Sequence, residues 1–159
     1  MKIVRLISKK FKLFLFDLKM RRSQSRLLKC RVTYGENTSG FKFVINNLGL
    51  IQLGSDVFLN SFPNGSSFKT VLNTYFTDSK IIIGNNCRLN GTIIHCNEQI
   101  EIGNNCMFGP GTVIVDNDSH RVSISYEERI KKPISKPIKI GNNVWVGMNC
   151  IILKGVTIG

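Results

Sequence analysis

The sequence predicts an all-β fold, a triangular parallel β-helix built from six-residue repeats, and two observations lead to it. The motif Ile-Gly-Asn-Asn begins at Ile83 and returns at Ile102 and Ile140. In the runs that these copies begin, an apolar residue occupies every sixth position: Ile83 and Leu89; Ile102, Phe108 and Ile114; Ile140, Val146, Ile152 and Ile158. Helices repeat every 3.6 residues and half-buried strands every two, so neither explains this spacing. A chain that turns a corner after every sixth residue does, because each flat face then points an apolar side chain inward.

The first 31 residues form a separate basic segment, and we expect an amphipathic helix over residues 1–29. Its apolar face holds Val4, Ile7, Phe11, Phe14, Leu15 and Leu18, and Lys2, Arg5, Lys9, Lys12 and Lys19 form a stripe nearly opposite. Residues 1–31 contain eleven Lys and Arg and one acid, Asp17, so they supply +10 of the formal charge of +12. The remaining chain carries only +2, so no nucleic-acid partner is expected. Lysines interrupt the apolar positions, so we expect neither a secretory signal nor a membrane span.

Two interpretations of this helix remain open. It can rest on an anionic membrane surface through residues 1–29, which would make a cytoplasmic protein peripheral at the inner face of the membrane. It can instead pack its apolar face on the β-helix or on a neighbouring subunit. The five cysteines have no paired metal spacing, and we expect them to be small buried residues in a reducing compartment, with no metal bound.

Residues 32–80 are less regular than the rest, and we expect them to form degenerate first coils. Their candidate inward positions are Val44, Leu53, Val57 and Leu59, and Asn64-Gly65-Ser66-Ser67 predicts a turn. The regular β-helix is expected over 81–159.

The spacing also shows where the repeat is interrupted. The first two motif copies lie 19 residues apart, one more than a full coil of three hexads, which predicts a one-residue bulge near Asn97 or Glu98. No hexad fits 116–137, so we expect an extruded loop there. The loop holds His120, and histidine is the usual general base for removing a proton from a hydroxyl near neutral pH.

Residues from about 81 to 159 resemble the hexapeptide-repeat acyltransferases, in particular the galactoside/maltose O-acetyltransferases and the capsular and colanic-acid polysaccharide O-acetyltransferases. The matching segments are Ile102–Ile114, the Asp-Ser-His sequence ending at His120, Pro137–Gly147 and Ile152–Gly159. The resemblance implies a left-handed β-helix that assembles as a homotrimer. It also implies an acetyl-CoA-dependent O-acetyltransferase, with acetyl-CoA as acyl donor in the groove between subunits and a sugar or surface-polysaccharide hydroxyl as acceptor.

The resemblance further implies roles for single residues. His120 matches the catalytic base, which would deprotonate the acceptor hydroxyl as it attacks the thioester directly, without an acyl-enzyme. Trp145 matches an aromatic residue beside the cofactor, although a surface aromatic at a subunit interface is the alternative. Gly147 and Lys154 fall in the cofactor-facing stretch.

Two residues are candidates for the acceptor side. Asn90 lies near the place where the family has a substrate-binding asparagine. Asp116 can contact the substrate or, like Asp118, orient the imidazole, and both can equally be turn residues.

The sequence also departs from the family. Met148 occupies a position that is often serine in the galactoside group, and the chain stops at Gly159, where relatives continue with coils that hold much of the cofactor. We therefore expect a C-terminal truncation, and a non-catalytic or impaired scaffold is the alternative function. A γ-class carbonic anhydrase needs three histidine ligands, but the chain has only His95 and His120. The acceptor sugar, and O- versus N-acetylation, are left open.

Overall fold

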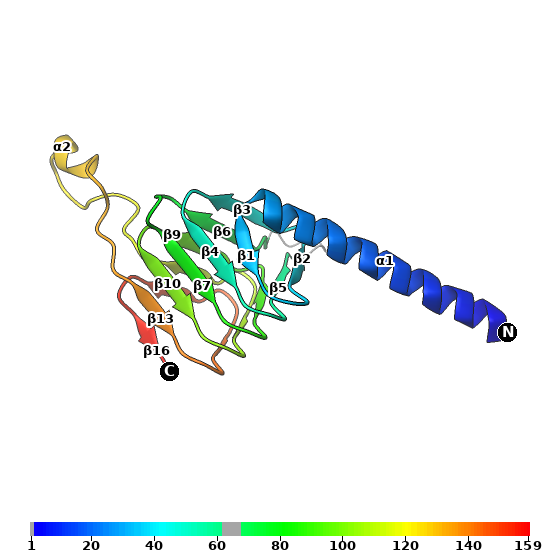
Figure 1. Ribbon diagram of the computed structural model, residues 1–159. Helices are drawn as coiled ribbons and strands as arrows, with labels where there is room; N and C mark the ends of the chain where they lie inside the picture. Colours follow the sequence, from blue (N-terminus) through cyan, green and yellow to red (C-terminus); the bar gives the residue numbers. More distant parts are fainter. Residues whose placement is uncertain (1, 62–67) are drawn as a thin grey trace.

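Three parallel sheets form the faces of a triangular prism in the computed structural model, which describes residues 2–61 and 68–159, with side chains from Phe14 onward (Figure 1). Sheet A consists of β1 (Val32–Tyr34), β4 (Leu50–Leu53), β7 (Lys80–Ile83), β10 (Gln99–Ile102), β13 (Ile138–Ile140) and β16 (Thr157–Ile158). Sheet B consists of β2 (Ser39–Phe41), β5 (Phe58–Asn60), β8 (Arg88–Asn90), β11 (Met107–Phe108) and β14 (Trp145–Val146). Sheet C consists of β3 (Val44–Asn47), β6 (Val71–Thr74), β9 (Ile93–Cys96), β12 (Val113–Val115) and β15 (Ile151–Leu153).

Consecutive strands pass from sheet A to sheet B to sheet C, so each coil visits all three faces. We name the turns between them the first corner (A to B), the second corner (B to C) and the third corner (C to A). Parallel pairing of every described strand confirms the predicted fold class and is consistent with a left-handed β-helix. The expected turn at 64–67 lies outside the described residues.

The interior is the row of sixth-position residues that the sequence predicted. The buried members are Ile83, Leu89, Ile102, Phe108, Ile114, Ile140, Val146 and Ile152. They stack in register: Ile102, for example, lies between Ile83 and Ile140 in sheet A. Each coil therefore buries its apolar side chains against the coils above and below it.

The first corners are built by the Gly-Asn-Asn triplets. The second asparagine of each triplet adopts a left-handed conformation, with φ of 54° at Asn86, 59° at Asn105 and 60° at Asn143. Their side-chain amides form a ladder, from Asn86 to Asn105 and from Asn105 to Asn143, at 3.0 Å each. A Cβ at Gly84 would lie 2.8 Å from the backbone of Gly103, so the stacked coils leave room only for glycine there.

The extra residue between the first two regular coils arises differently from the single bulge that we predicted. From Ile94 to Ile102, across the third corner at Asn97 and Glu98, there are eight residues, against six at the equivalent step from Ile152 to Ile158. The second corner just before it, between Leu89 and Ile94, is one residue shorter than the equivalent corner between Phe108 and Ile114. The coil as a whole is therefore one residue longer than three hexads. The expected position was right, but the expansion is two residues with a compensating deletion.

The extruded loop leaves the third corner after β12 and returns at β13. It carries a short helix, α2 (Tyr126–Arg129), well away from the coils (Figure 1). The chain makes this excursion without disturbing the stack, because Ile138 on its far side still pairs with Ile100.

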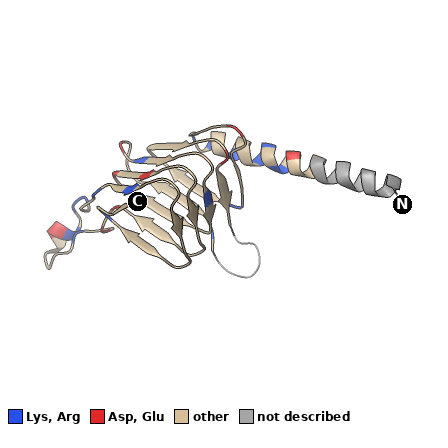
Figure 2. Ribbon diagram, turned by 90° about the horizontal axis from the view of Figure 1, so that it is seen from below, with Lys and Arg blue, Asp and Glu red and all other residues tan. Residues whose placement is uncertain are grey.

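The N-terminal helix α1 (Lys2–Lys29) contacts the coils through its C-terminal part. Leu27 is fully buried, and the hydroxyl of Ser23 accepts the Gly40 N–H at 2.7 Å. Further toward the N-terminus the helix extends away from the prism, and Phe14 and Phe16 are both exposed (Figures 1 and 2). No described helix is long and apolar enough to cross a membrane.

Candidate functional site

His120 lies just beyond a short stalk formed by the two ends of the extruded loop. Three backbone contacts join these ends: Asn117 with Ser135, Asp118 with Ile134, and Lys136 with Asp116. The stalk holds the backbone of His120 next to the third corner, and the His120 side chain is exposed.

The backbone around His120 also orients its ring. Nδ1 lies 3.3 Å from the carbonyl oxygen of Arg121. A carbonyl oxygen only accepts, so in this contact Nδ1 carries the hydrogen and Nε2 keeps its lone pair. The His120 N–H in turn donates to the carbonyl oxygen of Asp118 at 2.7 Å. This arrangement presents a basic nitrogen at the surface, as a general base requires.

Asp116 holds the corner from which the loop departs. Its side chain is 0% exposed. One carboxylate oxygen accepts the N–H of Asn97 and the other that of Glu98, each at 2.7 Å. The amide of Asn117 and the thiol of Cys96 donate to the same carboxylate. Burial and these four donors favour a structural role over the substrate-binding or imidazole-orienting roles that the sequence suggested.

Lys154 lies in the third corner between β15 and β16. Its ammonium group forms an ion pair with Asp118, and the two side chains are 29% and 26% exposed. The next N–H, that of Gly155, donates to the Lys136 carbonyl oxygen at 3.1 Å. Lys154 therefore contacts the stalk of the loop, on a different edge of the prism from Trp145.

Three of the predicted residues meet on the outer face of sheet B. Asn90, Trp145 and Gly147 line a shallow cavity of about 340 Å³ with Asn60, Met107, Phe108, Gly109, Pro110 and Met148. The Trp145 side chain is 78% exposed. A Cβ added at Gly147 would meet no described atom within 4 Å, so nothing in the described chain requires glycine there.

A second cavity, which sequence reasoning missed, adjoins the base of the loop. It measures about 390 Å³ and is lined by Tyr75, Phe76, His95, Asn97, Asn117, Ser119 and Pro133. Asn97 and Asn117 are only 5% and 8% exposed, yet both reach it. The Asn97 amide group makes no hydrogen bond to another described residue. Two buried amides beside aromatic rings suit a ligand rich in hydroxyl groups.

His95 is fixed within this second cavity. Its Nδ1 lies 2.6 Å from the Tyr75 hydroxyl and 3.2 Å from the Asn73 amide nitrogen. The Tyr75 and His95 rings are stacked, with centroids 5.8 Å apart. Burial lowers the pKa of His95, which favours the neutral ring with Nδ1 as acceptor. The outward position of His95, one coil before the loop, was the available signal in the sequence for this role.

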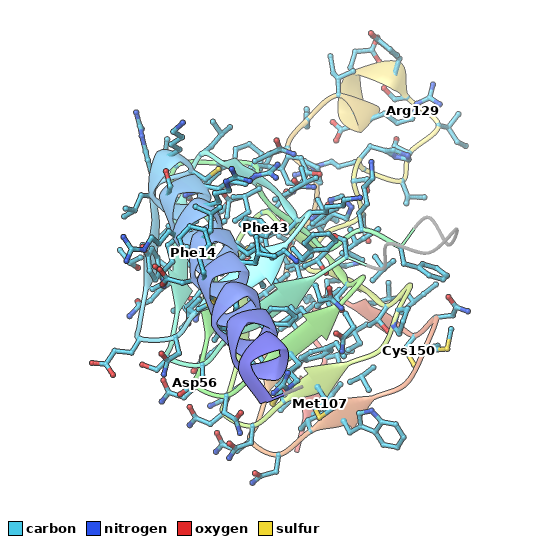
Figure 3. All side chains as sticks on the ribbon, turned by 90° about the vertical axis from the view of Figure 1, so that its right-hand side faces the viewer. Phe14, Phe43, Asp56, Met107, Arg129 and Cys150 are labelled. Carbon is cyan, nitrogen blue, oxygen red and sulfur yellow. The ribbon has the colours of Figure 1, made fainter. Side chains whose placement is uncertain are left out.

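The two groups of residues lie on different edges of the prism. His120 and Lys154 belong to third corners, whereas Asn90, Trp145 and Gly147 belong to sheet B and its second corner. Figure 3 shows Arg129, which lies on the loop beyond His120, on the opposite side of the view from Met107 of sheet B. Within one chain these groups do not form a single site.

Among the described residues no cluster of three or more His, Cys, Asp or Glu side chains could hold a metal ion. All five cysteines are free. Burial raises the pKa of the Cys87 thiol to about 11 and raises that of Cys96, where the Asp116 carboxylate adds to the effect. These two thiols stay protonated at neutral pH and are poor nucleophiles.

A parallel β-helix with an imidazole on an extruded loop is the arrangement that the resemblance to hexapeptide-repeat acyltransferases led us to expect. Comparison with known proteins supports a resemblance to sugar O-acetyltransferases. Over 58 residues the chain is 44% identical to a polysialic acid O-acetyltransferase of Neisseria meningitidis, covering 36% of this chain and 26% of that protein. Over 60 residues it is 42% identical to a galactoside O-acetyltransferase of Lactococcus lactis subsp. lactis (strain IL1403), covering 38% and 28%.

The aligned stretch thus spans little more than a quarter of each relative. No protein-family model matches the chain. No solved structure matches it either.

Proposed function

We propose that this protein is an acetyl-CoA-dependent O-acetyltransferase that modifies a sugar or surface-polysaccharide hydroxyl. One observation carries the proposal: His120 stands on the extruded loop with Nδ1 against a backbone carbonyl and Nε2 available to take a proton. The names of the two relatives support the same reaction class.

In the proposed reaction, Nε2 of His120 removes the proton from the acceptor hydroxyl. The oxygen then attacks the thioester carbonyl, the new C–O bond forms and the C–S bond breaks. CoA leaves as a thiolate and receives the proton from the imidazolium. The raised pKa values of Cys87 and Cys96 disfavour a cysteine acyl-enzyme at those positions, which supports direct transfer.

The cavity on sheet B is the proposed donor side. Trp145 offers an exposed aromatic face for packing against acetyl-CoA, and the free space beside Gly147 lets an extended ligand approach the backbone. Asn90 adds an amide to the wall of the same cavity, where Asn60 donates to it at 3.5 Å.

The cavity at the base of the loop is the proposed acceptor side. Tyr75 and Phe76 supply flat apolar surfaces, and Asn97 and Asn117 supply amides, a combination suited to a sugar ring. The neutral imidazole of His95 offers Nε2–H as a further donor.

Because the donor and acceptor sides lie on different edges of one prism, we propose a homotrimer in which the loop of one subunit reaches sheet B of the next. Exposed apolar side chains on both surfaces support this assembly. They are Met107, Trp145 and Met148 on or beside sheet B, and Val122, Ile124, Tyr126 and Ile130 on the loop.

We also propose that α1 rests on an anionic membrane at its cytoplasmic face, where acetyl-CoA and lipid-linked glycans would both be within reach. Phe14 and Leu15 of the predicted apolar face are exposed, as are the basic residues Arg22, Arg26 and Lys29, and both observations support this proposal. The full chain should cosediment with phosphatidylglycerol vesicles at low salt and detach at high salt. Equal binding to neutral phosphatidylcholine vesicles, or none to either, would leave contacts between subunits as the role of the helix.

The function is tested by release of free CoA from acetyl-CoA with a galactoside or an oligosialic acid, the acceptors that the relatives' names suggest. The wild-type chain should release CoA only with acceptor present. His120→Ala should lower kcat/KM by roughly 100-fold or more, the usual contribution of a general base, while its circular dichroism and Tm stay unchanged. Full turnover in His120→Ala would overturn the assignment. Failure of the wild type with every acceptor would favour a scaffold.

A further inference from the structure

The extruded loop is tied to the coils by one ion pair. Of the four ion pairs among the described residues, the pair between Asp118 and Lys154 is the one that joins the loop to a β-coil. Two others lie within the loop, around Glu128, and one lies within α1. Lys154 comes from the coil after the loop, 36 residues beyond Asp118. The contact therefore fixes the loop against a separate part of the prism.

The third corner that contains Lys154 and Gly155 contacts both segments of the stalk. Lys154 holds Asp118 on the outgoing strand, and the Gly155 N–H donates to the carbonyl oxygen of Lys136 on the returning strand. With both strands held, the stalk cannot tilt toward or away from the coils without breaking one of the two contacts.

The position of Asp118 also affects that of His120, the proposed general base. Its carbonyl oxygen accepts the His120 N–H at 2.7 Å, and only Ser119 separates the two residues. Ser119 has a φ of 62°, in the left-handed region that non-glycine residues avoid, and its N–H donates to the Asn117 side chain at 2.8 Å. The turn from Asp118 to His120 is thus tightly determined, and a shift of Asp118 displaces the imidazole.

We propose that Lys154 and Asp118 act together as positioning residues that hold His120 at the reacting hydroxyl, and that Lys154 does so in place of the cofactor contact that the family resemblance implies. The inference rests on the proposed function of His120. A misplacement of about 1 Å in a catalytic group can cost on the order of 100-fold in rate. Because this ion pair is partly exposed, we expect a smaller loss when it is removed.

The test uses acetyl transfer by the full-length chain, with kcat and the KM for acetyl-CoA measured separately. Lys154→Met and Asp118→Asn should each lower kcat by roughly tenfold, with KM for acetyl-CoA changed less than twofold. Lys154→Arg should retain most of kcat, and the exchanged double variant Asp118→Lys/Lys154→Asp should recover at least half of the lost activity. Lys139→Met, an exposed lysine on β13 with no ion pair among the described residues, is the matched control and should behave as wild type.

Other outcomes would overturn the inference. A raised KM for acetyl-CoA in Lys154→Met but not in Asp118→Asn would return Lys154 to cofactor binding. A lower Tm in both variants, with activity lost only in proportion to unfolded protein, would reduce the pair to a structural role. Failure of the proposed function would look different, because the wild type itself would then transfer no acetyl group.

Discussion

Asp116 and Asn97 join two neighbouring coils, since a carboxylate oxygen of Asp116 accepts the backbone N–H of Asn97 at 2.7 Å. The second oxygen takes the N–H of Glu98 at the same distance. The expanded third corner therefore depends on a side chain from the following coil, at the residue where the loop begins.

Replacing Asp116 should destabilise the fold. In Asp116→Ala the buried N–H of Asn97 and the partly buried N–H of Glu98 lose their acceptor, and each buried loss of this kind costs about 1–3 kcal/mol. Urea unfolding should show a free energy of unfolding lower by about 2–5 kcal/mol. Asp78→Ala, at an exposed position on the preceding third corner, is the control and should stay within about 0.5 kcal/mol of wild type. Similar losses in both variants would contradict this role of the Asp116 carboxylate.

Gly147 and Gly109 should respond differently to alanine, although they occupy equivalent corners of successive coils. A Cβ at Gly109 would lie 2.7 Å from the Gly147 backbone, so Gly109→Ala should lower the Tm. Gly147→Ala meets open space and should keep the Tm. If the donor lies there, the methyl group should raise the KM for acetyl-CoA roughly fivefold or more, because an intruding methyl costs about 1–3 kcal/mol. An unchanged KM would place the donor elsewhere.

His95 should make stability fall on the acid side. Its folded-state pKa is lowered by burial, so as pH drops below the ordinary value of 6.5 the unfolded chain binds this proton first. Stability from this group is complete above that pH and is lost below it. Between about pH 7.5 and about pH 5, the Tm of His95→Asn should therefore fall by less than the Tm of the wild type. Parallel Tm curves for the two proteins would contradict this.

Shared sites in a trimer can be tested by mixing inactive subunits. His120→Ala and Trp145→Ala should each be nearly inactive alone. After unfolding and refolding together in equal amounts, about a quarter of the sites would pair an intact His120 with an intact Trp145 from the neighbouring subunit, so about a quarter of the activity should return. If both variants are inactive alone and their mixture is no more active, then both residues serve one site within a chain.

The sequence was sufficient for the repeat and for the loop. Inward positions such as Ile102 and Ile140 follow from spacing alone, because a six-residue period has one simple structural solution. The position of His120 on an extruded loop also followed, since an interrupted repeat must leave the stack. Asn90, Trp145 and Gly147 came from resemblance, and the structure places them around one cavity.

The sequence was less informative about side chains whose partners are distant along the chain. Asp116 was expected near the substrate, and its burial depends on Asn97 and Glu98, about 20 residues earlier. Lys154 was expected at the cofactor, and its ion pair with Asp118 depends on which corners stack. The Tyr75 and His95 pair was missed because two coils had to be superposed before the residues met.

For this protein, the sequence by itself determined the β-helix, its interior and the place where His120 leaves it, because these depend on local periodicity. Only the tertiary structure decided which outward-facing side chains share an edge of the prism. Stacking brings residues about one coil apart into contact, and the corner expansions and the loop set the register of that stacking. That register separates Trp145 from His120 and brings Lys154 to Asp118.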